Sequence, residues 1–170
     1  MELFGKMLQG LQYNMPTMPQ EWQEQNQANK KRWFLGNEEA IEFINCFFYA
    51  VELWDDLIDK DNPISDEFVN DVFTNLMFVL PQNRWFMAHS QYYAPLIMAS
   101  INGFHDANEM CKSDKLHIRN LAFHIRNFGI ELHIATAFLL GGYKHMREVS
   151  REIREFFAFE TFEEWELNHV

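Results

Sequence analysis

The sequence predicts an all-α protein, a bundle of roughly six to eight helices. Apolar residues recur at helical spacing along most of the chain, and no stretch alternates between apolar and polar residues with period two. The 170 residues, 48% of them hydrophobic, suffice for one well-packed domain. We therefore expect a single α-helical domain over residues 1–170, with a peripheral N-terminal segment (1–36), a helical core (37–157) and a C-terminal turn (158–170).

The first three helices follow from apolar spacing and from residues that start or stop a helix. Residues 1–13 have helical spacing but contain two glycines, so this marginal helix needs a surface on which to dock. A second helix is expected over residues 20–33. The basic run Lys30-Lys31-Arg32 in its last turn is interpreted as a solvated helix end, with contact to an anion as the alternative. Asn37 can cap a third helix, which ends before Pro63.

The middle of the chain predicts two more helices separated by a short aromatic segment. Ser65 starts a helix whose apolar side includes Phe68 and Phe73, and Pro81 ends it. Residues 82–93 are rich in aromatic side chains and are expected to form a separate short segment. Pro95 then occupies a first-turn position of a helix that runs to about residue 111.

The last third predicts one long helix, one charged helix and a final turn. The long helix begins at Ser113-Asp114, runs to Leu140 and ends at two consecutive glycines. A charged amphipathic helix over 143–157 follows. Thr161 and Glu164 then have the spacing of a capping box, which opens a short helical turn.

Composition narrows the class of partner and the compartment. A formal net charge of −11 argues against binding to nucleic acid or to an anionic membrane surface. The two cysteines, Cys46 and Cys111, are expected to be small buried hydrophobes in a reducing compartment. We find no signal peptide, and the most apolar stretch, 128–143, is too short to span a bilayer. We expect a soluble cytoplasmic protein, with a homodimer as one possible state.

The helix over 37–61 is apolar around most of its circumference but carries one narrow polar stripe. Steps of three and four residues align Glu38, Glu42, Asn45, Tyr49, Glu52, Asp56 and Asp59, with Asp55 beside them. A helix apolar nearly all round is normally buried, and buried carboxylates are costly unless paired, protonated or bound to a cation. The stripe therefore indicates a cation site, and the alternative is an ordinary solvated helix face.

Two further helices carry polar stripes of the same kind. One consists of Asn102, Asp106 and Glu109, with His105 adjacent. The other consists of His117, Asn120, His124, Asn127 and Glu131. If the three stripes converge, the bundle contains an oxygen-rich pocket suited to Mg²⁺ or Mn²⁺, which bridge to substrate phosphates. The alternative is that these are surface faces of amphipathic helices.

The run Asp55-Asp56-Leu57-Ile58-Asp59 resembles the DDxxD motif of class I isoprenoid (prenyl and terpene) synthases. In that family the motif lies on a long helix facing the bundle cavity, and its carboxylates bind Mg²⁺ ions that hold a prenyl diphosphate. The resemblance implies an isoprenoid-synthase-like bundle with magnesium bound by Asp55, Asp56 and Asp59, supported by Glu52 or by Asp106 and Glu109. Candidate substrate-binding residues are Arg126, Lys115, Asn102 and His124; catalytic residues are not assigned.

A second resemblance points to a different Mg²⁺-dependent reaction of a diphosphate-containing substrate. Glu38-Glu39-Ala40-Ile41-Glu42 and Glu52-Leu53-Trp54-Asp55 are similar to the ExxE and ExxD motifs of the all-α nucleoside triphosphate pyrophosphohydrolases. A third hypothesis involves no catalysis. In it the acidic stripes face solvent or a partner, and the exposed part of the 16% aromatic content forms a protein–protein interface.

Overall fold

The computed structural model describes residues 18–60 and 62–169, and every regular element in these two ranges is a helix. The prediction of an all-α protein is therefore confirmed. The chain divides into two compact units, Met1–Ala88 and His89–Val170. The single domain over 1–170 stays a prediction, and the helix expected over 1–13 lies outside the described residues.

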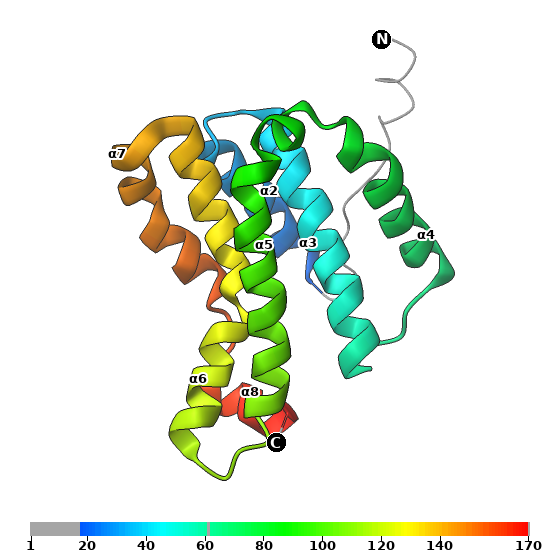
Figure 1. Ribbon diagram of the computed structural model, residues 1–170, viewed down its shortest axis with the longest axis vertical. Coiled ribbons are helices and arrows are strands. Elements are labelled where there is room, and N and C mark those ends of the chain that lie inside the picture. The colour runs from blue at the N-terminus through cyan, green and yellow to red at the C-terminus, as the bar shows by residue number, and fades with distance from the viewer. Residues whose placement is uncertain (1–17, 61, 170) are drawn as a thin grey trace. The chain divides into compact units, whose positions relative to one another are not determined.

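The first unit is built around α3. It contains α2 (Gln20–Trp33), α3 (Glu38–Asp59), α4 (Asp66–Thr74), the π-helical turn η1 (Asn75–Val79), the 3₁₀ turn η2 (Leu80–Gln82) and the start of α5 (Arg84–Met110) (Figure 1). Two predicted caps are confirmed. The Asn37 side chain accepts a hydrogen bond from the backbone N–H of Ala40 at 2.9 Å, and Ser65 Oγ accepts one from Phe68 at 3.1 Å.

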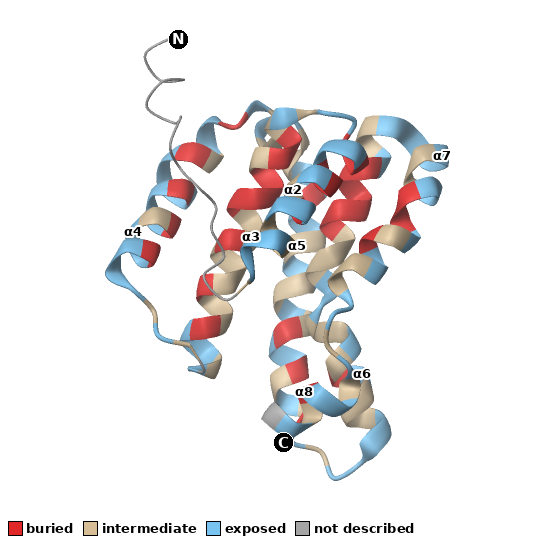
Figure 2. Cartoon of the chain, turned by 180° about the vertical axis from the view of Figure 1, so that it is seen from behind, coloured by how far each residue is buried: buried red, intermediate tan, exposed pale blue. Residues whose placement is uncertain are grey.

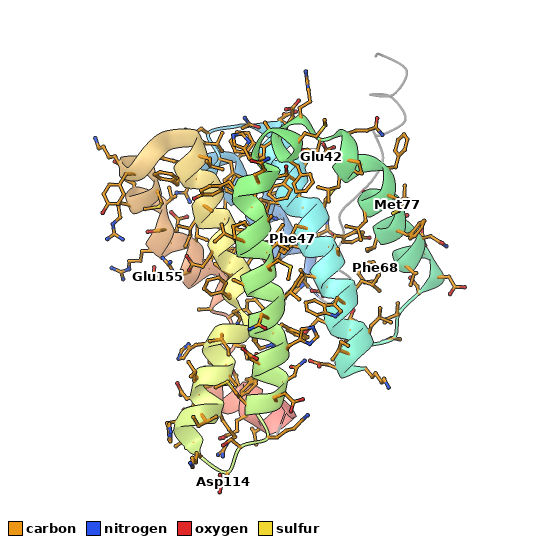
Figure 3. All side chains as sticks on the ribbon, in the orientation of Figure 1. Glu42, Phe47, Phe68, Met77, Asp114 and Glu155 are labelled. Carbon is orange, nitrogen blue, oxygen red and sulfur yellow. The ribbon has the colours of Figure 1, made fainter. Side chains whose placement is uncertain are left out.

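The core of this unit lies between α3 and its neighbours. Tyr49 and Leu53 of α3 pack against Phe68 and Val72 of α4, with the Tyr49 and Phe68 rings 4.9 Å apart between centroids. Figure 3 shows Phe68 on the side of α4 that faces α3. Towards the start of α3, Phe43 is fully buried. These contacts fix α4 against the C-terminal half of α3.

The second unit contains the rest of α5, then α6 (Leu116–Arg126), the 3₁₀ turn η3 (Phe128–Ile130), α7 (Glu131–Phe157) and α8 (Phe162–His169). Trp165 of α8 packs with Ala107, Cys111 and Ala122, and Figure 1 shows α8 beside α6. The predicted capping box is present, because Thr161 Oγ1 accepts the Glu164 N–H at 3.2 Å and Glu164 Oε2 accepts the Thr161 N–H at 2.9 Å.

Two predicted helix boundaries are wrong. Helix α5 begins at Arg84 and continues through Pro95, so most of the expected aromatic segment is helical. The reason is Asn83, whose Oδ1 accepts the Phe86 N–H at 2.8 Å and caps the helix about three turns before Pro95. Downstream, the expected helix from 114 to 140 is interrupted between Arg126 and Glu131 by η3.

The predicted stop at the two glycines is a kink rather than an end. Gly142 has φ 71° and ψ −174°, a backbone conformation that only glycine adopts readily, yet helical structure resumes and α7 reaches Phe157. The separate helix over 143–157 is therefore the second half of α7.

The count of six to eight helices in one bundle is not confirmed. Within the described residues five helices exceed ten residues: α2, α3, α5, α6 and α7, with 14, 22, 27, 11 and 27 residues. The shorter α4 and α8 have 9 and 8 residues. In the part of the chain that the structure describes, no helix combines the length and apolar character needed to cross a membrane.

Candidate functional site

The polar stripe of α3 is largely withdrawn from solvent. Asn45, Tyr49 and Asp56 are buried, and Glu52 and Asp59 are half-buried. A solvated helix face, the alternative considered for this stripe, therefore does not describe its middle. Buried polar side chains need hydrogen-bond partners, and Asn45 and Asp56 receive theirs from different parts of the first unit.

Asp56 is held by the loop that follows α3. Its Oδ1 accepts a hydrogen bond from Asn62 Nδ2 at 2.9 Å, and its backbone carbonyl accepts the Lys60 N–H at 3.0 Å. Lys60 has φ 58° and so ends the helix in the left-handed conformation. The carboxylate of Asp56 thus fixes the path of the chain between α3 and α4.

The opposite end of the stripe is joined to the start of α5. Asn83 Nδ2 donates to Glu42 Oε2 at 2.9 Å and to the Glu39 backbone carbonyl at 2.9 Å. Arg84 forms an exposed ion pair with Glu39 at 2.7 Å. The Glu38–Glu42 carboxylates, which resemble an ExxE motif, therefore lie where α3 meets the end of the first unit.

The middle of the stripe lies in a negative electrostatic environment. The pKa of Tyr49 is raised first by burial of its hydroxyl and then by the negative charges of Asp71 and Glu67 on α4. Two carboxylates of α4 therefore act on the Tyr49 hydroxyl of α3. A cation would be favoured there, but favourable potential alone does not make a coordination site.

The candidate metal ligands do not gather into a group within one unit. Among the described residues, no three His, Cys, Asp or Glu side chains lie close enough together to hold a metal ion. Glu52, Asp55 and Asp59 each already interact with neighbours. Asp106 and Glu109 belong to the second unit, so the convergence of the three stripes stays a prediction.

In the second unit the stripe of α5 is exposed and internally bonded. Asn102 Nδ2 donates to Asp106 Oδ2 at 2.8 Å, and Glu109 lies 3.6 Å from Lys112 in an exposed ion pair. Hydrogen bonds and ion pairs between exposed side chains one turn apart are common on helix surfaces and contribute little stability. These residues form an ordinary helix surface in this unit.

The other candidate substrate-binding residues lie on or beside α6. The Arg126 guanidinium stands over the Phe104 ring at 5.9 Å, a cation–π contact within the second unit. Lys115 and His124 are exposed, and the His124 imidazole lies 5.4 Å from the Phe123 ring. The described contacts hold Arg126 against an aromatic ring and leave Lys115 and His124 in solvent.

Burial of Lys30 was not predicted from the sequence. Lys30 is only 1% exposed, and its Nζ donates to Asn45 Oδ1 at 2.8 Å. Burial lowers the pKa of Lys30 from 10.5 to about 7. The interpretation of the basic run as a solvated helix end is wrong for Lys30, although Lys31 and Arg32 are exposed.

The surroundings of Lys30 are amides rather than carboxylates. Asn45 also exchanges two long hydrogen bonds with Gln27, at 3.3 and 3.4 Å. Asn26, one turn before Lys30 on α2, is buried, and its Oδ1 has no hydrogen-bond partner within the described residues. The buried side of α2 consists of Asn26, Asn29, Lys30 and Trp33. These four residues have the 0, 3, 4, 7 spacing of one helix face, which could have predicted a buried side. The pattern was hard to recognise because three of the four residues are polar.

Helix α4 and η1 expose a row of apolar side chains. Phe68, Val72 and Val79 are buried towards α3, but Phe73, which was predicted for the same apolar side, is exposed. Four neighbours form an exposed second row, which we call the α4–η1 stripe: Val69, Phe73, Leu76 and Met77. Figure 2 shows buried residues on one side of α4 and exposed ones on the other. Phe73 and Met77 are each 65% exposed.

Comparisons with known proteins found no relative of this chain. No protein-family model matches the chain, and searches of curated proteins and of solved structures found no match either. The function is therefore inferred from the side chains described above.

Proposed function

We propose that the protein is a non-catalytic helical interaction module whose α4–η1 stripe binds a basic amphipathic helix of another protein. The observation that carries the proposal is the exposure of Phe73 and Met77 beside two other apolar residues on one helix face. A contiguous exposed apolar row of this kind is typical of an interaction site, whereas single exposed apolar residues are normal.

The spacing of the stripe fits a helical partner. Val69, Phe73, Leu76 and Met77 follow a 0, 4, 7, 8 pattern, which presents apolar side chains along about 12 Å of the helix. An amphipathic helix laid along this row would place its own anchors between these side chains. Complete burial of an exposed Phe or Met side chain contributes roughly 1.5–3 kcal/mol.

The acidic residues of α4 favour a partner helix that carries basic residues. Asp66 and Glu67 stand in the first turn of α4, and Asp71 lies between Val69 and Phe73 in sequence. Glu67 and Asp71 are each two residues from Val69 and so lie off the stripe face, where their charges raise the pKa of Tyr49 on α3, whereas Asp66, three residues before Val69, flanks the stripe. A partner helix with Lys or Arg beside its apolar row is therefore favoured over an acidic one, in agreement with the net charge of −11.

The test uses two labelled synthetic helices that share one leucine-rich apolar row and differ only in Lys or Glu flanks. We expect the Lys-flanked peptide to bind more tightly by fluorescence anisotropy. Phe73→Asp should weaken binding at least tenfold, the equivalent of about 1.4 kcal/mol. Phe159→Asp is the matched control, because Phe159 is 60% exposed and lies in the second unit. Equal binding by the two variants, or no binding of either peptide by the unmodified protein, would refute the proposal.

A second candidate function is Mg²⁺-dependent binding of a diphosphate at the end of α3, in an isoprenoid-synthase-like protein or, alternatively, a pyrophosphohydrolase. The supporting observation is that Asp55, Asp56 and Asp59 occupy the last turns of a 22-residue helix and that Asp56 among them is buried. Asp55 and Asp59 are half-buried, so their oxygens retain access to solvent and to an ion.

Thermal unfolding separates this candidate from the interaction module. A diphosphate site predicts that Mg²⁺ with inorganic pyrophosphate raises the unfolding midpoint, and that Asp55→Asn abolishes the rise. Asp66→Asn, at an exposed carboxylate of α4, is the matched control. No rise in the unmodified protein would remove the diphosphate function and leave peptide binding unaffected.

A further inference from the structure

We propose that Lys30 is the attacking amine of a buried covalent site for a small uncharged aldehyde or ketone, with Asn45 and Asn26 as its polar neighbours. This site is independent of the α4–η1 stripe, because it lies where α2 packs on α3. Three properties of these residues support it: the charge state of the amine, the unused hydrogen-bonding capacity of Asn26, and the buried apolar side chains that adjoin these residues on α2 and α3.

The amine of Lys30 is unusually available as a nucleophile. Its Nζ has no carboxylate partner in the described part of the chain, and an unpaired buried ammonium is strongly disfavoured. With a pKa of about 7, the amine is about nine-tenths neutral at pH 8. An ordinary lysine with a pKa of 10.5 is neutral in only about 0.3% of molecules at that pH. The neutral fraction thus rises roughly 300-fold.

The polar neighbours are arranged to hold the amine and one added oxygen. Lys30 donates one hydrogen to Asn45 Oδ1 at 2.8 Å, which orients Nζ and leaves its lone pair available. Asn26 is four residues earlier on α2 and therefore on the same buried face. Its Oδ1 is buried without a hydrogen-bond partner among the described residues. In the proposed site this oxygen accepts a hydroxyl hydrogen from a group attached to Nζ.

The reaction balances without a further reagent. The Nζ lone pair forms a bond to the carbonyl carbon, the C=O π electrons move to oxygen, and a proton passes from nitrogen to that oxygen to give a carbinolamine. The hydroxyl then leaves with the second amine proton as water, and a C=N bond forms. Asn26 Oδ1 accepts a hydrogen bond from the carbinolamine hydroxyl. An acceptor that otherwise has no partner is therefore satisfied in this intermediate.

The surroundings restrict the carbonyl compound to a small neutral one. Trp33 and Phe34 are fully buried at the end of α2, and Phe43 and Ile44 are fully buried beside Asn45 on α3. A carboxylate or phosphate on the substrate would lose its hydration in such apolar surroundings. Entry requires local opening between α2 and α3, which favours a compound of a few heavy atoms.

Reductive methylation with isotope-labelled formaldehyde and cyanoborohydride tests the site, because the imine formed on each lysine is trapped as a methylamine. Peptide mass mapping then compares Lys30 with Lys31, the adjacent and exposed lysine of the same protein molecule. We expect Lys30 to react about tenfold faster at pH 8, since part of the 300-fold advantage is lost to lower nucleophilicity and to burial. Its rate should level off above pH 7, whereas that of Lys31 continues to rise.

Two variants and a measurement in urea test why Lys30 reacts faster than Lys31. Asn26→Leu should slow Lys30 without moving the pH at which its rate levels off, which separates positioning of the reaction from a change in pKa. Asn45→Asp should place a carboxylate beside the amine, raise its pKa and remove the advantage at pH 8. In urea the two lysines should react alike. A folded protein in which Lys30 reacts no faster than Lys31 overturns the proposal.

Discussion

Replacing Lys30 with methionine should change how stability depends on pH. The pKa of Lys30 is about 7 in the folded protein and 10.5 without burial, so between these values the unfolded chain binds more protons. Stability of the unmodified protein therefore rises with pH through this window, by up to about 1.4 kcal/mol per pH unit. Allowing for partial protonation at pH 7, the gain from pH 7 to pH 9 is about 2 kcal/mol. Lys30→Met has a similar side-chain length and no ionisable group, so this gain should be absent.

Urea unfolding of both proteins at pH 7 and pH 9 measures this difference directly. The free-energy advantage of Lys30→Met over the unmodified protein should be largest at pH 7 and should shrink by about 2 kcal/mol at pH 9. Taking the difference between proteins cancels the titration of unrelated groups. Lys31→Met is the matched control and should show no such change, because Lys31 is exposed. A difference between Lys30→Met and the unmodified protein that is the same at both pH values would refute a low pKa for Lys30.

Three further changes test single contacts. Asn62→Ala removes the side-chain bond to the buried Asp56 carboxylate and should lower the free energy of unfolding by about 1–3 kcal/mol in urea. Gly142→Ala places a Cβ on a backbone with φ 71° and should lower stability by about 1–3 kcal/mol in the same assay. The hydrogen bonds from Thr161 lower the pKa of Glu164, so the stabilisation from this group is present above the unfolded pKa and is lost as pH falls through the folded one. Thr161→Ala should raise that pKa towards its ordinary value in an NMR titration.

Each of these changes has an outcome that contradicts its premise. Unchanged stability in Asn62→Ala would mean that Asp56 does not depend on this bond, and the loop after α3 would need another explanation. Unchanged stability in Gly142→Ala would show that α7 can straighten at the kink without cost. If the pKa of Glu164 does not rise at all in Thr161→Ala, the Thr161 hydroxyl does not stabilise the carboxylate, and the backbone N–H of residue 161 is its effective donor.

Helix starts were predictable wherever a side chain caps its own helix. Asn37, Ser65 and Thr161 each accept the backbone N–H of the residue three positions ahead, as their sequence context predicted. The start of α5 was missed because Pro95 was interpreted as a first-turn residue, whereas Asn83 provides the cap. A proline inside a helix removes one backbone bond, and the surrounding 27-residue helix tolerates that loss.

Burial of polar residues was harder to predict because it depends on tertiary partners. The polar stripe of α3 was identified from its spacing, but the sequence gives no indication that Asn62, Asn83 and Lys30 would supply its hydrogen bonds. Lys30 itself sits within a basic run of the type that usually ends a helix in solvent. Only the packing of α2 on α3 separates its environment from that of Lys31.

The polar stripe of α3 forms hydrogen bonds with three separate segments of the first unit. Its start is bonded to Asn83 before α5, its middle to Lys30 of α2, and its end to Asn62 in the loop before α4. A purely apolar helix could slide or rotate against its neighbours at little cost, whereas each of these bonds is satisfied in only one register. The buried polar residues of α3 therefore fix how α2, α4 and the start of α5 meet it, and this fixed arrangement leaves the α4–η1 stripe exposed beside the buried face of α4.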